Sequence, residues 1–353
     1  MNISSEVKTV PGYQFASDNT VGICPEALAA LVAANEGAVA SYGEDKITVR
    51  VADRLREIFD CSCEVFFVFN GTAANSLAVS TCCQPYHSVI CADVAHLETD
   101  ECGGPEFFSG GAKVLLADSI DGKLRPGSVE KLITGRKDIH YPKPHVISLT
   151  QPTELGTSYG VDEVKELSGL ARRFGLRVHM DGARLANAIA ALEIEPSDIT
   201  WKAGVDILCL GGAKLGLPLG EAILFFNKEL AADFAYRCKQ AGQLASKMRF
   251  LTAPWLGVLE DDVWLGHAAH ANAMARQLAD GLTKIAGVQV LYPVDVNAVF
   301  ASLPEACHRT LAHRGWRYYT FIGRGGARFM CSWATTEQDV YALLADIRAP
   351  THV

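Results

Sequence analysis

Two apolar runs, each ending in glycines and polar residues, place the strongest constraint on the fold. The first covers residues 176–184 and ends in Asp181-Gly182-Ala183-Arg184, and the second covers residues 205–214 and ends in Gly211-Gly212-Ala213-Lys214. Short apolar runs closed by glycine indicate buried strands followed by turns. Because the carboxyl ends of parallel strands meet at one edge of a sheet, we expect Asp181 and Lys214 to lie close together.

The rest of the first half alternates between helix-like and strand-like stretches. Helices are predicted over residues 25–35, 46–59, 71–83 and 161–173, and strands over residues 63–69, 88–91, 112–116 and 146–150. Such alternation is typical of an α/β fold with a mostly parallel central sheet flanked by helices.

The pattern changes after Phe226. Helices are predicted over residues 229–246, 261–286 and 337–347, the last capped by Thr335 or Thr336, and short strands over residues 288–292, 298–303, 316–321 and 327–333. We therefore predict two domains, a large α/β domain over residues 1–254 and a smaller C-terminal α+β domain over residues 255–353.

Composition limits the classes of partner. Hydrophobic residues make up 49% of the 353 residues and charged residues 20%, which is typical of a water-soluble protein with a large core. The net charge of −8 disfavours nucleic acid and anionic membranes as partners. The sequence shows no apolar run close to the roughly 18 residues that a membrane helix needs.

The eleven cysteines argue against a disulfide framework, because their number is odd and residues 1–6 lack the basic and apolar regions of a signal peptide. We therefore predict a cytoplasmic protein. Cys61 and Cys63 form a C-x-C pair and Cys82 and Cys83 are adjacent, but neither pair has a second half at zinc-binding spacing. No metal site is predicted.

A lysine and an aspartate at neighbouring strand ends suit pyridoxal phosphate chemistry. The amine of Lys214 can form a Schiff base with the cofactor aldehyde, and Asp181 can keep the pyridine nitrogen protonated. Alone, the lysine is equally consistent with a solvated side chain on a buried turn. Residues 70–75, Asn-Gly-Thr-Ala-Ala-Asn, supply a helix start after a strand, where Gly71 and Thr72 can bind a phosphate.

Three further residues are candidates for the same site. His96 follows another strand and can stack on the cofactor ring or take a proton, although a histidine on an exposed loop fits the spacing as well. Arg184 comes three residues after Asp181, and Arg328 begins a strand-like run. A guanidinium group suits bidentate capture of a substrate carboxylate.

Together these motifs make the chain resemble the L-threonine aldolases, more closely the bacterial low-specificity branch and its phenylserine aldolase relatives. The resemblance covers nearly the whole chain. It is carried by residues 17–19, 70–75, 150–156, 179–184 and 211–214 and by His96 with Gly103 and Gly104. It implies a fold-type-I pyridoxal phosphate enzyme that forms a homotetramer or homodimer with its sites at the subunit interface.

The resemblance also assigns roles to single residues. It implies that Lys214 carries the cofactor, that Asp181 contacts the pyridine nitrogen and that His96 stacks over the ring. Gly71 and Thr72 bind the phosphate, and Ser17, Arg184 and Arg328 bind the substrate carboxylate, with Arg184 also beside the cofactor. Arg249 is implied to reach the phosphate of a neighbouring subunit, and Tyr42 to be a pocket residue on the interface side.

The implied reaction is retro-aldol cleavage of an L-β-hydroxy-α-amino acid (threonine, allo-threonine or phenylserine) to glycine and an aldehyde. Two departures leave details open: Ala213 stands where relatives carry a hydroxyl residue, and Gln151 and Glu154 stand where another branch has a histidine. The catalytic base is therefore His96 or a water ordered by the phosphate. A β-eliminating lyase or an aminotransferase acting on a small amino acid would use the same lysine and aspartate, and a non-catalytic protein that retains the fold is a third alternative.

Overall fold

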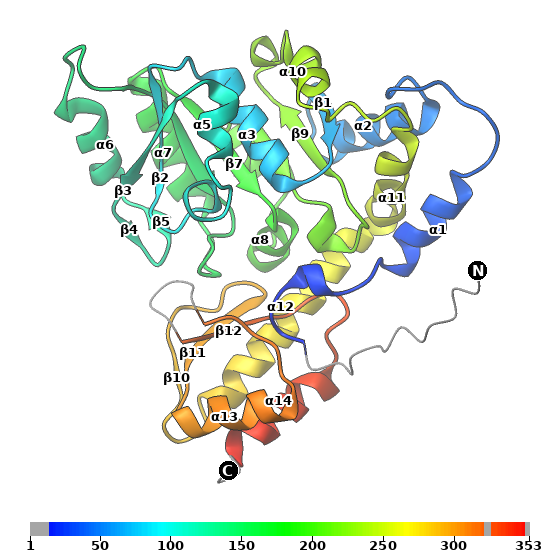
Figure 1. The fold of residues 1–353 in the computed structure, drawn as a ribbon, viewed down its shortest axis with the longest axis vertical. Coiled ribbons are helices and arrows are strands. Elements are labelled where there is room, and N and C mark those ends of the chain that lie inside the picture. Colours follow the sequence, from blue (N-terminus) through cyan, green and yellow to red (C-terminus); the bar gives the residue numbers. More distant parts are fainter. Residues whose placement is uncertain (1–13, 321–325, 350–353) are drawn as a thin grey trace.

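The computed structural model describes residues 14–320 and 326–349 and shows a large upper part and a smaller lower part (Figure 1). The large part contains a seven-stranded sheet and the small part a three-stranded sheet. The long helix α12, Val263–Leu282, runs from the large part into the small one (Figure 1).

The central sheet has the strand order β1-β9-β8-β7-β6-β2-β3. Its strands are β1 Glu64–Val68, β2 His87–Ala92, β3 Lys113–Ala117, β6 Lys143–Thr150, β7 Arg177–Gly182, β8 Ile207–Leu210 and β9 Glu221–Phe225. Strands β3, β2, β6, β7 and β8 run parallel to one another. Strand β9 is antiparallel to both β8 and β1. The prediction of a mostly parallel sheet is confirmed. Strand β9 was not predicted.

Helices cover this sheet because its strands are apolar on both faces; β2, β8 and β9 are buried along their whole length. Helix α3, Gly71–Cys82, packs along β7, β8 and β9, while α6, Pro126–Gly135, and α7, Val161–Arg173, pack on β3, β6 and β7. The other helices of this part are α1 Pro25–Ala33, α2 Lys46–Ile58, α4 His96–Thr99, α5 Gly104–Ser109, α8 Leu185–Leu192, α9 Pro196–Ile199, α10 Phe234–Gln240 and α11 Arg249–Leu259. A short hairpin, β4 Ser119–Ile120 with β5 Lys123–Leu124, lies beside them.

The small part consists of an antiparallel sheet of β10 Gln289–Val290, β11 Ala298–Ser302 and β12 Ala327–Met330 with helices α13 Glu305–Arg314 and α14 Glu337–Arg348. Its core includes Leu278, Phe329 and Leu343 together with Phe15 from the start of the described chain. The core of the large part extends to Trp264 and Ala268, so the two cores meet along α12. The predicted boundary after residue 254 stays a prediction.

Two sequence predictions in the second half differ from the structure. The helix predicted over residues 229–246 is instead a 3-10 turn, Lys228–Ala231, followed by the short helix α10, which ends before Gly242 because this glycine takes a left-handed φ of +73°. In the strand predicted over residues 316–321, Tyr319 forms an isolated bridge to Arg328, and Phe321 lies outside the described residues. Within the described ranges, no helix has the length and apolar character needed to span a bilayer.

Helix α14 begins with a capping box that allows a test of the fold. The Thr336 hydroxyl accepts a hydrogen bond from the Asp339 N–H at 3.1 Å, and the Asp339 carboxylate accepts one from the Thr336 N–H at 2.9 Å. Thr336→Ala removes this cap and is expected to lower the free energy of unfolding by about 1 kcal/mol. Urea unfolding of Thr336→Ala measures this, with Thr336→Ser as the control that keeps the hydroxyl. An equal loss in the serine variant would contradict the role of the cap.

Candidate active site

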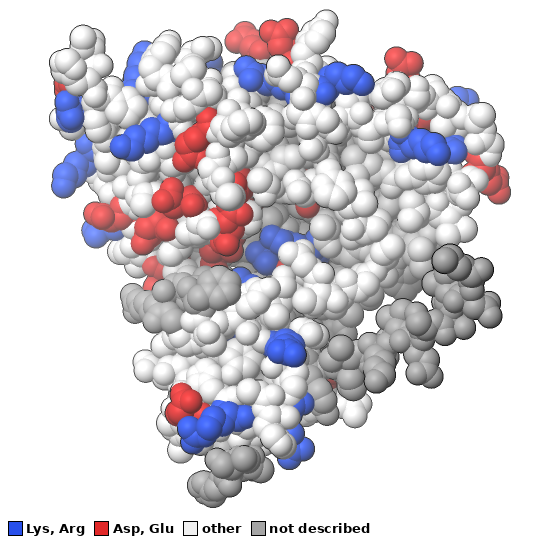
Figure 2. All heavy atoms as spheres, viewed as in Figure 1, with Lys and Arg blue, Asp and Glu red and all other residues white. Residues whose placement is uncertain are grey.

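Five of the predicted site residues line one hollow between the large and the small part. The hollow has a volume of about 420 Å³ and is lined by Ser17, Asn19, Val94, His96, Thr99, Asp100, Glu154, Arg184, Lys214, Tyr319 and Arg328. Figure 2 shows basic side chains inside this hollow and acidic side chains along its edge. A larger surface hollow of about 750 Å³ beside α2 is lined by none of the predicted residues.

Close packing of two backbone turns brings Lys214 to this hollow. A Cβ atom on Gly211 would lie 2.2 Å from the Ala183 carbonyl oxygen, so only glycine lets the turn after β8 lie on the turn after β7. A Cβ atom on Gly212 would similarly lie 2.3 Å from the Gly220 carbonyl oxygen. Lys214 follows in a 3-10 turn, Ala213–Leu215, and its charge acts on the buried carboxylates of Asp18 and Glu221.

A buried polar chain runs from Asp181 to His96. Asn75 donates from its Nδ2 to Asp181 at 3.0 Å and to Glu101 at 2.7 Å, and Glu101 contacts His96 Nδ1 at 2.9 Å. The Asp181 carboxylate also accepts a hydrogen bond from the Ala183 N–H at 3.0 Å. One ligand atom each from His96, Glu101 and Asp181 lies within 4.8 Å of the others, which concentrates negative charge beneath the hollow.

This arrangement shifts the pKa of two of its members. Burial acts to lower the pKa of His96, but the hydrogen bond to Glu101 and the charges of Asp181 and Glu154 outweigh it, so the pKa lies above its ordinary value. Burial raises the pKa of Glu101, against the hydrogen bonds from His96 and Asn75. These buried, hydrogen-bonded side chains therefore favour a positively charged group facing Asp181.

The arginines occupy a different side of the hollow. Arg184 donates from Nε and Nη2 to Asp18 at 2.6 and 2.9 Å, and Asn297 donates to the same carboxylate at 3.3 Å. Burial acts to raise the pKa of Asp18, but the charges of Arg184 and Lys214 and the hydrogen bonds from Arg184 and Asn297 together hold the pKa below its usual value. Arg184 is thus held rigidly by an internal partner, with two of its donors used.

Arg328 has donor capacity left. Its Nη2 donates to the Ala16 carbonyl oxygen at 3.0 Å and its guanidinium lies 4.9 Å from the centre of the Tyr319 ring. Its Nε is buried and has no hydrogen-bond partner among the described residues. Burial, followed by the charge of Arg184, lowers the pKa of Arg328. A buried N–H without a partner costs free energy, so the Arg328 guanidinium is suited to donate hydrogen bonds to an anion.

The start of α3 has the features expected of the predicted anion-binding position. The Asn70 side chain caps the helix by accepting from the Ala73 N–H at 2.9 Å, and a Cβ atom on Gly71 would meet nothing within 4 Å. The N–H groups of Gly71 and Thr72 belong to the first turn, where the helix dipole favours negative charge. Asn75, one turn on, reaches Asp181. A buried carboxylate, a lysine and a helix start with open space together fit pyridoxal phosphate.

Tyr42 and Arg249 do not line the hollow. Tyr42 is 48% exposed and its N–H donates to the Ser246 carbonyl oxygen at 3.1 Å. Arg249 donates to the carbonyl oxygens of Glu36 and Gly37. Both lie on one surface region of the same chain, so their predicted contact with a neighbouring subunit's site stays a prediction.

Four residues of the site were not assigned from the sequence: Asp18, Asn75, Glu101 and Glu221. Glu101 follows His96 by five residues, but a loop position has no periodicity from which to predict its partner. Glu221 begins the unpredicted strand β9 and accepts a hydrogen bond from the Gly212 N–H at 2.6 Å. Burial raises the pKa of Glu221 to about 7. A lone carboxylate at the start of an apolar run was the available signal.

Comparison with known proteins gives a consistent result. The β-eliminating lyase family matches residues 14–306. A low specificity L-threonine aldolase from Pseudomonas sp. (strain NCIMB 10558) is 59% identical over 97% of this chain and 99% of its own length, and one from Pseudomonas aeruginosa is 59% identical over 95% and 97%. The chain belongs to the low-specificity L-threonine aldolases.

Solved structures agree with this assignment. The threonine aldolase of Leishmania major has a TM-score of 0.89 and 29% identity, covering 95% of this chain and 98% of its own. Serine palmitoyltransferase from S. paucimobilis, solved with bound pyridoxal phosphate, has a TM-score of 0.71 at 17% identity, which shows a shared fold; it covers 96% of this chain and 86% of its own. The predictions of the family, fold class, lyase activity and pyridoxal phosphate cofactor are confirmed.

The buried hydrogen bonds between Asp181 and His96 allow a prediction of how the pH dependence of the enzyme changes in a variant. Glu101→Gln removes the negative charge that stabilises the charged imidazole and leaves only a neutral amide oxygen as acceptor, so the pKa of His96 falls. If neutral His96 is needed for turnover, the acid limb of the kcat/KM profile moves to lower pH. Histidine titration by NMR together with the pH profile measures this. Glu98→Gln, a change at an exposed residue of α4, the helix that begins with His96, is the control. An unmoved His96 titration in Glu101→Gln would contradict the coupling.

Proposed function

We propose that this hollow cleaves L-β-hydroxy-α-amino acids such as threonine, allo-threonine and phenylserine to glycine and an aldehyde, with the residue roles described below. The observation that carries the proposal is that Lys214, His96 and Arg328 line one hollow, while Asp181 is buried and connected to His96 through Asn75 and Glu101. The volume of about 420 Å³ suits a small ligand.

The cofactor is held by residues of the large part. When the cofactor is bound, Lys214 would hold its aldehyde group, Asp181 would keep the pyridine nitrogen protonated, and the N–H groups of Gly71 and Thr72 would bind its phosphate. When bound, pyridoxal phosphate supplies an electron-accepting ring that takes up the electron pair released at the substrate α-carbon. Asn75 and Glu101 orient Asp181 and His96 at this end of the site.

The substrate carboxylate is bound by Arg328. Its buried Nε lacks a partner among the described residues, and Nη2 is held by Ala16, so the fork is fixed in direction. Arg184, fixed by Asp18, adds positive charge beside it, and Ser17 lines the same side. Gripping the carboxylate fixes rotation of the substrate, so that the Cα–Cβ bond is held in the orientation in which it breaks.

His96 is the proposed base that takes the β-hydroxyl proton. Glu101 engages its Nδ1, which leaves Nε2 as the nitrogen for the substrate. The raised pKa makes the imidazole a stronger proton acceptor than an ordinary histidine. Loss of this proton lets the aldehyde leave as the Cα–Cβ bond breaks.

We further propose that the enzyme works in the cytoplasm as a homotetramer or homodimer in which Tyr42 and Arg249 approach a neighbouring subunit's site. Apolar side chains are exposed on and after α1: Leu28 is 46% exposed, Val32 66% and Val39 50%. Exposed apolar groups of this kind are typical of a surface that is covered on association. All eleven cysteines carry free thiols, which fits a reducing compartment.

A product assay tests the proposed reaction. Purified enzyme incubated with threonine, phenylserine and serine is expected to release glycine and an aldehyde from the first two. Lys214→Ala is expected to lose this activity and the visible absorption of the lysine-bound cofactor, while a Lys202→Ala control keeps both. Ammonia and a keto acid as the products, or an unchanged spectrum in Lys214→Ala, would contradict the proposal.

The role of Arg328 has its own test. Arg328→Met removes a buried guanidinium that anchors the carboxylate, which typically costs about 2–5 kcal/mol. We expect kcat/KM for phenylserine to fall at least about 30-fold, mainly through a higher KM. Arg328→Lys keeps the charge but loses the fork, and should recover little. Arg317→Lys, a change at an exposed arginine outside the hollow, is the control. Full activity of Arg328→Lys would show that only charge matters.

A further inference from the structure

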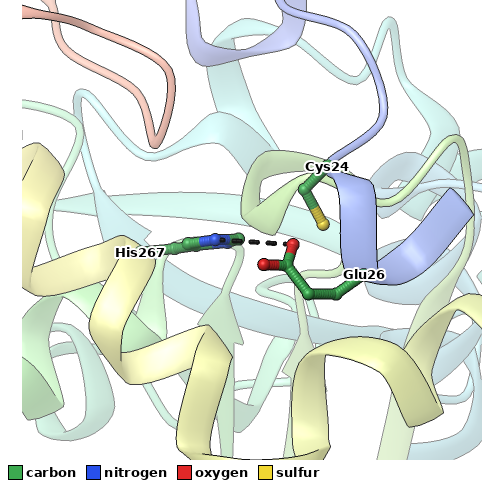
Figure 3. Close-up of side chains that lie close together, drawn as sticks. All are labelled: Cys24, Glu26 and His267. Carbon is green, nitrogen blue, oxygen red and sulfur yellow. Dashed lines mark ion pairs between the residues drawn. The ribbon is translucent and has the colours of Figure 1, made fainter. Parts of the chain in front are cut away.

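A second group of ligand-type side chains lies behind the turn that carries Lys214. Cys24 occupies the N-cap position of α1, and Glu26 lies in the first turn of that helix. His267 projects from α12. One ligand atom from each lies within 4.8 Å of the others. Figure 3 shows the edge of the imidazole directed at the Glu26 carboxylate, with the Cys24 sulfur beside it.

The spacing of these atoms fits a shared ion better than a direct hydrogen bond. His267 Nε2 and Glu26 Oε2 are 3.8 Å apart, beyond the usual 2.7–3.2 Å of a hydrogen bond. Ligands bound about 2.0–2.3 Å from a tetrahedral Zn²⁺ lie roughly 3.3–3.8 Å from one another. A small inward movement of the Glu26 and His267 side chains, which are both partly exposed, therefore completes the geometry.

Glu26 presents an unsatisfied acceptor to this position. Its Oε2 is buried and has no hydrogen-bond partner among the residues that the structure describes, although the side chain as a whole is 41% exposed. The exposed remainder provides a route for an ion from solvent.

His267 has the surroundings of a metal-binding histidine. Its Nδ1 contacts the Leu215 carbonyl oxygen at 3.4 Å, which selects the tautomer with the proton on Nδ1. With that proton on Nδ1, the Nε2 atom faces Glu26 and Cys24 and is available to a cation bound between them. The Trp333 ring stacks on the imidazole at 5.5 Å and fixes its plane.

From this geometry we infer that Cys24, Glu26 and His267 form a binding site for a divalent transition metal ion of the Zn²⁺ class. One thiolate, one imidazole and one carboxylate suit Zn²⁺ or Co²⁺, whereas Mg²⁺ and Ca²⁺ prefer oxygen ligands. Binding forms the metal–sulfur bond and releases the Cys24 proton to solvent. Three protein ligands leave a fourth position for water.

The site is joined to the turn of Lys214 by two backbone contacts. The Cys24 N–H donates to the Gly216 carbonyl oxygen at 2.8 Å, and His267 contacts the Leu215 carbonyl oxygen. Both carbonyl groups follow directly after Lys214. A bound ion would therefore hold Leu215 and Gly216 in place, directly after Lys214, which lines the hollow.

Metal binding to the holoenzyme tests the inference. Protein treated with a chelator is titrated with Co²⁺ or Zn²⁺, and the bound metal is counted by elemental analysis after gel filtration. One ion per chain is expected, with the near-ultraviolet band of a cobalt–thiolate bond, and Mg²⁺ should not compete. Glu26→Gln and His267→Gln are each expected to weaken binding about 10–100-fold, and Cys24→Ser to remove the thiolate band.

Cys61→Ser is the matched control, because Cys61 is a partly exposed thiol outside the proposed site. It should leave both the stoichiometry and the cobalt spectrum unchanged. Glu26→Gln keeps the test decisive if the buried Cys24→Ser variant fails to fold, since Glu26 is partly exposed. Wild-type protein without bound ion, or binding unaffected by both Glu26→Gln and His267→Gln, would overturn the site.

Discussion

The approach of two backbone turns at the ends of β7 and β8 positions the rest of the site. The turn after β8 lies on the Ala183 carbonyl group, at a separation that excludes any side chain on Gly211. Since β7 and β8 are parallel neighbours, this packing fixes Lys214 and Arg184 on one side of the sheet and places Asp181 beneath them. The catalytic groups are thus held by backbone geometry rather than by their own flexible side chains.

Charge is distributed unevenly around the hollow, and each end suits one part of the bound molecules. Asp181 and Glu101 make one end negative, which would suit a protonated pyridine ring. Arg184 and Arg328 make another side positive, which would suit a carboxylate. Asp18 neutralises one of the two arginines, which limits their mutual repulsion in a buried position. The site therefore orients a substrate by its charges.

Residues at strand ends were predictable from the sequence, whereas residues in loops were not. Asp181 and Lys214 follow apolar runs whose parallel pairing fixes where the chain emerges, so the periodicity alone placed them together. Glu101 lies between short helices, and only the folded chain shows that it bridges His96 and Asn75. The helix over residues 229–246 was predicted wrongly because its apolar spacing outweighed the effect of Gly242. The predicted roles of Tyr42 and Arg249 depend on a second subunit, which one chain does not contain.

Residues 15–18 connect the packing of the small part to substrate binding. Phe15 lies in the small core and accepts a hydrogen bond from the Met330 N–H at 2.8 Å, Ala16 holds Arg328, and Asp18 holds Arg184. A movement of the small part relative to the large one would pull on both arginines through four consecutive residues. The same four residues therefore join the core of the small part to the two arginines that line the hollow, and a fusion or deletion that disturbs this short segment would displace both.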